Sequence, residues 1–146
     1  MKRRTALLTT IFWTILLLGA CNDSVWEQLP SSVSQFVTKY YPGSDIKSYN
    51  TDADGNQTVE IKNGAVLKFD RDGAWTEISG RGVPLPEVLV LDELPSPLYR
   101  YLQEITATTL VYKMSRTPRE YTLLLTDSML EYDIATEKVS YRESTL

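Results

Sequence analysis

Residues 58–78, TVEIKNGAVLKFDRDGAWTEI, decide the fold. Apolar and polar side chains alternate on both sides of the Asn63-Gly64 pair, and the apolar members of the alternation are Val59, Ile61, Leu67 and Phe69. A period of two is typical of a strand with one buried face, and Asn-Gly is a strong hairpin signal. Residues 70–73, DRDG, form the next predicted turn, and residues 74–78 a further strand. This stretch therefore predicts an antiparallel meander.

Upstream, the sequence predicts one more strand and a helix. Residues 46–49 are strand-like, and residues 51–56, TDADGN, form a turn cluster. Before them, apolar residues recur at three- and four-residue spacing, which is one face of an amphipathic helix: Val33, Phe36, Val37, Tyr40 and Tyr41. Pro42-Gly43 ends this helix. The first unit, residues 29–78, is thus a helix followed by about four short strands.

The same order returns after a linker at residues 79–93, in which residues 87–91 could form a short helix. The helical spacing that begins at Val33 is repeated from Leu98, at a constant offset of 65 residues, by Leu98, Tyr101, Leu102 and Ile105. Strand-like segments follow at 110–114, 121–125, 130–133 and 139–142. We interpret residues 94–142 as a diverged second copy of the first unit, with two unrelated α+β halves as the alternative.

The predicted fold class is therefore α+β. We expect two tandem helix-plus-antiparallel-meander repeats, residues 29–78 and 94–142, with the helices packed on one face of a combined antiparallel sheet. One helix on four strands buries too little surface to be stable alone, which favours joining of the two sheets. The opposite sheet face would then be open.

The N-terminus has the layout of an export signal. Lys2, Arg3 and Arg4 precede an apolar run at residues 6–18, which is too short for a comfortable membrane span. The run ends in Leu18-Gly19-Ala20-Cys21, which resembles the bacterial lipobox, and this resemblance implies a lipid on the thiol of Cys21. We predict a signal peptide at 1–20 and a lipidated tether at 21–28; the alternative is an ordinary signal or anchor with a chance cysteine.

Such a lipid would anchor the mature chain to a membrane of the cell envelope. Asn22 after the lipidated cysteine does not match the aspartate that commonly retains lipoproteins at an inner membrane. We therefore expect the periplasmic face of the outer membrane, with exposure at the cell surface as the alternative. The partners are then the membrane itself and an unidentified envelope protein.

Composition excludes several classes of function. The chain has no histidine, so no Ser-His-Asp or Cys-His arrangement and no imidazole metal ligand can form. One cysteine cannot form an internal disulfide. Without residues 1–20, twelve basic residues face 19 acidic ones, a net charge of −7 that disfavours nucleic acid. We predict no enzyme, no cofactor and no metal site.

Several motifs resemble the PepSY-like, putatively β-lactamase-inhibitor-like domains of Bacteroidetes-type bacteria. The resemblance spans roughly residues 29–141 and rests on Leu29-Pro30, Tyr40-Tyr41-Pro42-Gly43, residues 59–64 (VEIKNG), residues 67–75 (LKFDRDGAW) and the second Leu-Pro at 94–95. Two departures fall in the second repeat, where Asp127-Ser128 replaces the Asn-Gly turn and Thr136 stands near an expected glycine. The resemblance implies an inhibitor-like architecture whose sheet face is available to a partner.

Two candidate sites follow from the pattern. Residues 52–56, DADGN, suggest a calcium loop, but Gln57 and Asn63 stand where the glycine and glutamate of that motif belong, so a plain hairpin turn is favoured. The second candidate is the open sheet face. Its expected residues are Glu60, Lys68, Leu124, Met129 and Glu131, because their neighbours in the alternation face the helices.

The pattern does not decide whether Trp75 lies in the core or at the rim of the core. At the rim, an exposed indole would be an interface anchor. The interpretation we favour is a non-catalytic envelope lipoprotein that binds a protein through the sheet face, with enzyme inhibition as its extension. The alternatives are a solvated face on an envelope-sensing or structural accessory, and a small-molecule or calcium binder.

Overall fold

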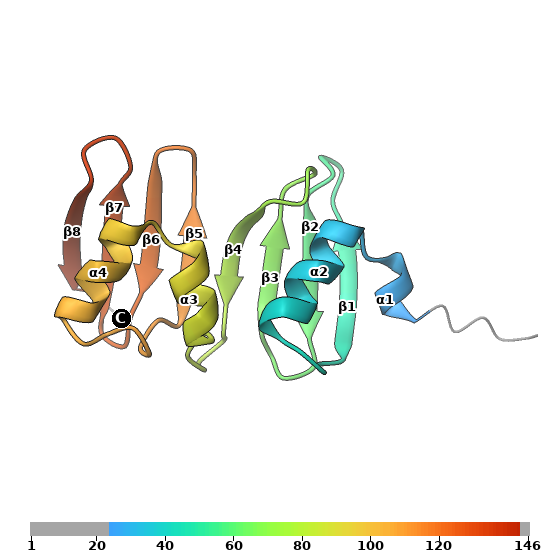
Figure 1. The fold of residues 1–146 in the computed structure, drawn as a ribbon. Helices are drawn as coiled ribbons and strands as arrows, with labels where there is room; N and C mark the ends of the chain where they lie inside the picture. Colours follow the sequence, from blue (N-terminus) through green and yellow to red (C-terminus); the bar gives the residue numbers. More distant parts are fainter. Residues whose placement is uncertain (1–23, 144–146) are drawn as a thin grey trace, which may run out of the picture.

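The computed structural model describes residues 24–143 (Figure 1). Within this part of the chain, eight strands form one antiparallel sheet in sequence order. The strands are β1 (Ile46–Thr51), β2 (Gln57–Ile61), β3 (Val66–Phe69), β4 (Trp75–Ser79), β5 (Lys113–Arg116), β6 (Glu120–Leu124), β7 (Ser128–Asp133) and β8 (Lys138–Glu143). The predicted α+β class is confirmed.

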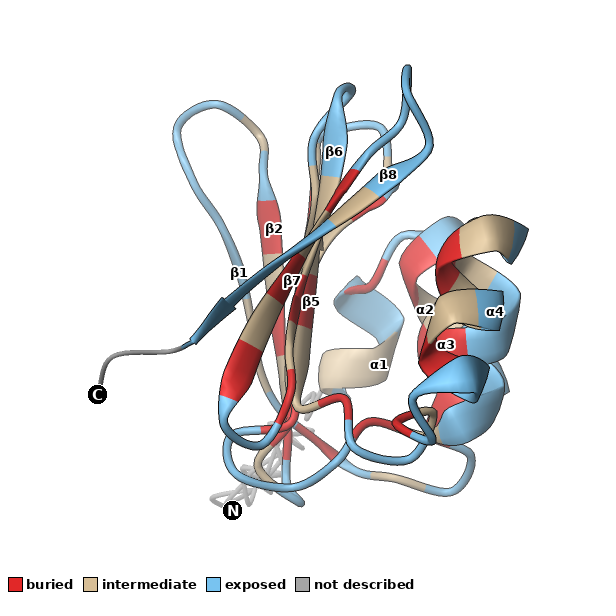
Figure 2. Cartoon of the chain, turned by 90° about the vertical axis from the view of Figure 1, so that its left-hand side faces the viewer, coloured by how far each residue is buried: buried red, intermediate tan, exposed pale blue. Residues whose placement is uncertain are grey.

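Four helices of residues 24–143 accompany the sheet: α1 (Val25–Gln28), α2 (Ser31–Tyr40), α3 (Glu87–Glu93) and α4 (Ser96–Glu104). They lie on one side of the sheet and leave the other side uncovered (Figure 2). None of the helices described is long and apolar enough to cross a membrane. The predicted signal peptide and the lipidation of Cys21 lie outside the described residues.

One continuous core lies between the helices and the sheet. Alternation places every second residue of a strand against the helices, as in β2, where Gln57, Val59 and Ile61 are buried. The helices contribute the faces that their spacing predicts, with Val33 and Val37 from α2, and Leu98 and Leu102 from α4. That the two units arose by duplication stays a prediction.

Three segments differ from the expectations. Residues 25–28, assigned to the tether, form α1, because Val25 and Trp26 pack against the core. The strand expected at 110–114 begins only at Lys113. The backbone carbonyls of Val111 and Tyr112 instead accept hydrogen bonds from the amides of Leu85 and Gly80. These two carbonyls are therefore paired with the linker.

Candidate functional site

The uncovered sheet face carries a shallow hollow of about 290 Å³ over β5, β6 and β7. Leu124 on β6 and Met129 on β7 are directly opposed cross-strand partners and line it together. Lys113, the partner of Leu124 on β5, and two hydroxyl side chains complete the lining, which is Lys113, Ser115, Thr122, Leu124 and Met129. Both predicted apolar residues therefore face away from the core and lie side by side.

Glu77 organises the charges beside this hollow. Its carboxylate lies between two lysines, with Oε1 2.9 Å from Nζ of Lys68 on β3 and Oε2 3.0 Å from Nζ of Lys113 on β5. Burial alone would raise the pKa of Glu77, but the hydrogen bonds from the two lysines outweigh it and lower the pKa below its ordinary value. Glu77 therefore stays ionised at neutral pH and pairs with both lysines.

The other predicted charged residues of the face are paired as well. Glu60 lies 2.8 Å from Nζ of Lys47 and 3.1 Å from Nη1 of Arg81. The hydrogen bond from Lys47 holds the pKa of Glu60 below its usual range. Glu131 pairs with Arg142 across β7 and β8 at 3.0 Å. The face thus presents an apolar centre next to acidic and basic groups that largely neutralise one another.

Sequence reasoning missed four residues of this face: Glu77, Lys113, Ser115 and Thr122. Alternation counted back from buried Ile78 places Glu77 on the open side. Ser115 was missed because β5 continues to Arg116, beyond the expected end at Met114. Lys113 lies within the expected strand, next to buried Met114 in the alternation. Thr122 follows from the same alternation that located Leu124.

Trp75 does not belong to the open face, which corrects its inclusion among the candidate binding residues. Its side chain is buried on the helix side, with 3% of its surface exposed. The reason is a bulge: Phe69 pairs with Trp75 while Lys68 pairs with Glu77, so Thr76 is an extra residue in β4. The bulge turns both Trp75 and Ile78 toward the core.

On the helix side, Trp75 joins a polar cluster. Its indole Nε1 donates to Oε2 of Glu93 at 2.7 Å, and the Tyr40 hydroxyl donates to Oε1 of the same carboxylate. The guanidinium of Arg116 lies over the indole, 4.1 Å from its ring centroid, and its Nε donates to the Trp75 carbonyl. Burial, together with the bond to Glu93, raises the pKa of Tyr40 to about 12.

The aspartate-rich turns are hairpin turns, as their sequence predicts. In the first, Oδ1 of Asp52 accepts the backbone N–H groups of Asp54 and Asn56, each at 2.9 Å. In the second, Oδ1 of Asp70 accepts those of Asp72 and Ala74 at the same distance. The two carboxylates thus cap their own turns. Residues 24–143 contain no group of three or more acidic, cysteine or histidine residues placed to hold a metal ion.

Fold and surface together define a small α+β module with helices on one side of an antiparallel sheet and an apolar-centred face on the other. The model of the family described as "Putative beta-lactamase-inhibitor-like, PepSY-like" matches residues 55–139. This match covers more than half of the chain, and the protein therefore belongs to the PepSY-like family. Comparison with curated proteins gives no match.

Solved structures show the same fold. A "putative periplasmic protein" of the DUF2874 family from Bacteroides vulgatus aligns with a TM-score of 0.68 and 22% identity, over 81% of this chain and 93% of its own. A "putative calcium-regulated periplasmic protein" from Bacteroides thetaiotaomicron gives 0.68 and 20%, with the same coverages. A second Bacteroides vulgatus protein, described as of unknown function, gives 0.65 and 17%, over 80% and 94%.

Proposed function

We propose that the protein is a non-catalytic lipoprotein of the cell envelope that binds another protein through its open sheet face. The observation that carries this proposal is the hollow formed by Leu124 and Met129. These two apolar side chains are opposed across β6 and β7 on a face that none of the four described helices covers. Binding surfaces in proteins typically have an apolar centre inside a polar rim.

The charges of the face favour an apolar contact over an ionic one. Lys113, which lines the hollow, is already paired with Glu77, and that carboxylate also holds Lys68. A partner would therefore gain little from placing an opposite charge here, because it would have to compete with these existing pairs. We infer a partner that inserts an apolar side chain, such as leucine, between Leu124 and Met129.

The envelope location is part of the same proposal. Three Bacteroides proteins with this fold are described as periplasmic, and the lipobox-like end of the signal sequence would tether this chain by a lipid on Cys21. An outer-membrane anchor would present the sheet face to other envelope proteins. The family description supports an inhibitor-like form of this function, in which the bound protein is an enzyme.

Site-specific photo-cross-linking in cells tests the proposal. A photoreactive residue placed at Thr122, beside the hollow, should give one defined cross-linked envelope protein. Leu124→Asp combined with Met129→Asp should reduce this product about tenfold or more, because two buried charges would oppose an apolar contact. The measurement is the yield of the product by immunoblot, with the partner identified by mass spectrometry.

Val88→Asp combined with Leu91→Asp is the matched control, because both residues are half exposed on α3, on the helix side. This control should leave the cross-link unchanged, and unfolding midpoints of both double variants should show that each remains folded. Equal cross-linking by the wild type and the Leu124/Met129 variant would contradict the role of the hollow.

A further inference from the structure

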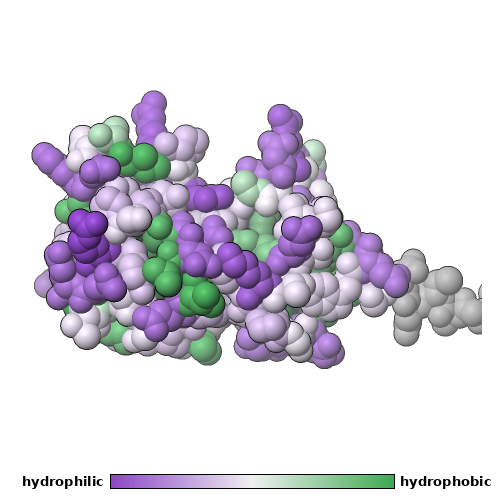
Figure 3. All heavy atoms as spheres, in the orientation of Figure 1, coloured by the Kyte–Doolittle hydropathy of each residue, from purple (hydrophilic) through white to green (hydrophobic). Residues whose placement is uncertain are grey.

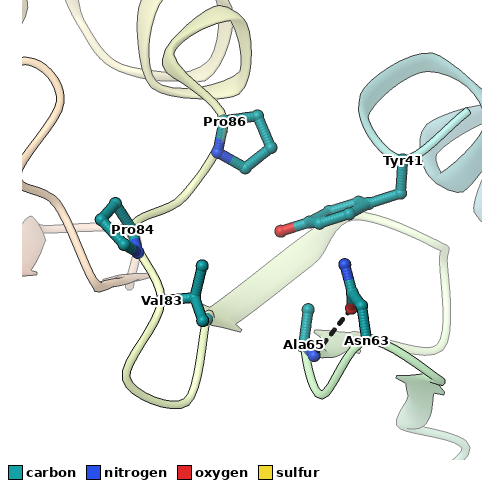
Figure 4. A pocket seen from close by; sticks show the side chains of 7 residues that line it. Tyr41, Asn63, Ala65, Val83, Pro84 and Pro86 are labelled. Atoms are coloured by element: carbon teal, nitrogen blue, oxygen red, sulfur yellow. Dashed lines mark hydrogen bonds between the residues drawn. The ribbon is translucent and has the colours of Figure 1, made fainter.

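A second cavity lies at the C-terminal end of α2. It has a volume of about 350 Å³ and lies between Tyr41, the turn joining β2 to β3, and the linker before α3. Figure 4 shows the side chains that surround it: Tyr41, Asn63, Ala65, Val83, Pro84 and Pro86. The volume is in the range of small-ligand sites in proteins.

The hydroxyl of Tyr41 is the unusual feature of this cavity. Only 7% of the residue's surface is exposed, and the hydroxyl has no hydrogen-bond partner within residues 24–143. In Figure 4 it points into the space between the β2–β3 turn and the linker. A buried polar group without a partner costs about 1–3 kcal/mol, so such groups usually have a reason. Burial also raises the pKa of Tyr41 to about 12, so the hydroxyl keeps its proton and can donate.

Asn63 supplies a second polar group. Its Oδ1 accepts the backbone N–H of Ala65 at 3.1 Å, which fixes the side-chain amide and turns Nδ2 toward Tyr41 (Figure 4). The cavity is thus lined by one O–H donor, one N–H donor and otherwise apolar groups. None of the residues that line it carries a charge.

The wall opposite Tyr41 is rigidly shaped. Val83 donates its backbone N–H to the carbonyl of Gly80 at 3.2 Å, which closes a tight turn. A Cβ atom at Gly80 would lie 1.8 Å from the Val83 carbonyl oxygen, so only glycine permits this approach. The two prolines that follow restrict the backbone further. The cavity is therefore largely formed before any ligand arrives.

Apolar side chains continue from this cavity onto the surface. Val83 is 58% exposed, and Val88 and Leu91 on α3 are 50% and 51% exposed. Figure 3 shows hydrophobic side chains gathered over α3 on this face. A ligand that fills the cavity could thus extend along an apolar surface.

We propose that this cavity binds an uncharged, peptide-like ligand, with a branched apolar group against Val83 and the prolines and a carbonyl oxygen that accepts hydrogen bonds from Tyr41 and Asn63. Two donors in one otherwise apolar cavity suit the acceptor oxygen of an uncharged ligand, and the absence of charged lining residues disfavours a carboxylate. This site is separate from the hollow at Leu124 and Met129, and one can fail without the other.

Titration of the full-length protein with N-acetyl-leucine amide, followed by amide NMR shifts, tests the proposal. A ligand this small should bind with Kd on the order of 1 mM. Saturable shifts should concentrate at the backbone amides of Ala65, Gly80 and Val83. Tyr41→Phe should weaken binding about tenfold, and Val83→Asp, at an exposed position, should weaken it by placing a charge beside the apolar group.

Ligand-free Tyr41→Phe should have a Tm equal to or above that of the wild type, because it removes an unpaired buried hydroxyl. Tyr99→Phe, on α4 away from the cavity, should leave binding unchanged. Absence of localised shifts, equal binding by Tyr41→Phe, or a lowered Tm of that variant would each overturn the proposal. N-acetyl-leucine, with its free carboxylate, should bind more weakly than the amide; tighter binding would overturn the assignment of an uncharged ligand.

Discussion

Glu93 holds the end of α3 against the first unit of the fold through two hydrogen bonds. Its carboxylate accepts from the buried Trp75 indole and from the buried Tyr40 hydroxyl. Glu93→Ala removes the acceptor for both donors and leaves the indole N–H unpaired. We expect it to lower the free energy of unfolding by about 3 kcal/mol, as measured by urea denaturation.

Asp92→Asn provides the comparison within the same helix. Asp92 forms its ion pair with Lys39 at the surface, and the amide of Asn retains an acceptor for the long contact from Tyr40. This substitution should change stability much less than Glu93→Ala does. Equal losses of stability in the two variants would show that the removal of a negative charge from α3 explains the effect of Glu93→Ala, and not the loss of an acceptor for two buried donors.

Individual side chains could be predicted from the sequence wherever alternation is regular. Leu124 and Met129 were placed on the open face because a period of two leaves little choice once Leu123 and Leu130 are buried. Trp75 could not be placed, since one extra residue at a bulge reverses the direction of every side chain before it. The unpaired hydroxyl of Tyr41 depends on the linker's path, which no local pattern predicts.

At the level of strands, the triad of Lys68, Glu77 and Lys113 joins β3, β4 and β5. Because the pKa of Glu77 is lowered in the folded protein, its pairing stabilises the fold above its ordinary pKa of 4.5. This contribution is lost as the pH falls through the lowered pKa that Glu77 has in the folded protein. We expect urea midpoints to decrease as the pH falls below about 5, with Glu77 contributing about 0.5–1 kcal/mol.

Glu77→Gln isolates that contribution. The variant should be less stable than the wild type at pH 7, and the difference should shrink as the pH falls through the lowered pKa of Glu77 and the wild-type carboxylate also becomes protonated. Glu87→Gln, on α3 and outside any ion pair of residues 24–143, should show the wild-type pH dependence. A constant difference between the wild type and Glu77→Gln across this range would argue against ionisation as the cause.

The turns were predictable because their chemistry is local. The DADG and DRDG segments each supply an aspartate that accepts two backbone N–H groups and a glycine at positive φ, Gly55 at 85° and Gly73 at 84°. The start of β5 was not predictable, because it depends on residues 80–85 pairing with residues 111–112 far along the chain. Local patterns therefore define the hairpins, and long-range pairing defines where the two units meet.

Across the whole molecule, the two meanders become one sheet through β4 and β5. Only three residue pairs form this junction: Glu77 with Ser115, Ile78 with Met114, and Ser79 with Lys113. The sequence indicated a combined sheet because each meander alone buries too little surface to be stable. The order of the strands and the place where the two meanders join follow from the connection through α3 and α4. The buried residues nevertheless form one cluster that includes side chains from both units.

This continuous core predicts that both units unfold together. Trp75 reports on the first unit and on its junction with β5, because Arg116 lies over the indole. A variant with Trp13→Phe and Trp26→Phe would retain it as the only tryptophan. Its fluorescence and the far-ultraviolet circular dichroism of the whole chain should give the same urea midpoint. Ile78→Val at the junction, expected to cost about 1 kcal/mol, should move both midpoints equally. A fluorescence transition that precedes or follows the dichroism would mean that the three-pair junction and the contacts of Glu93 are too weak to couple the units, and that each unit unfolds on its own.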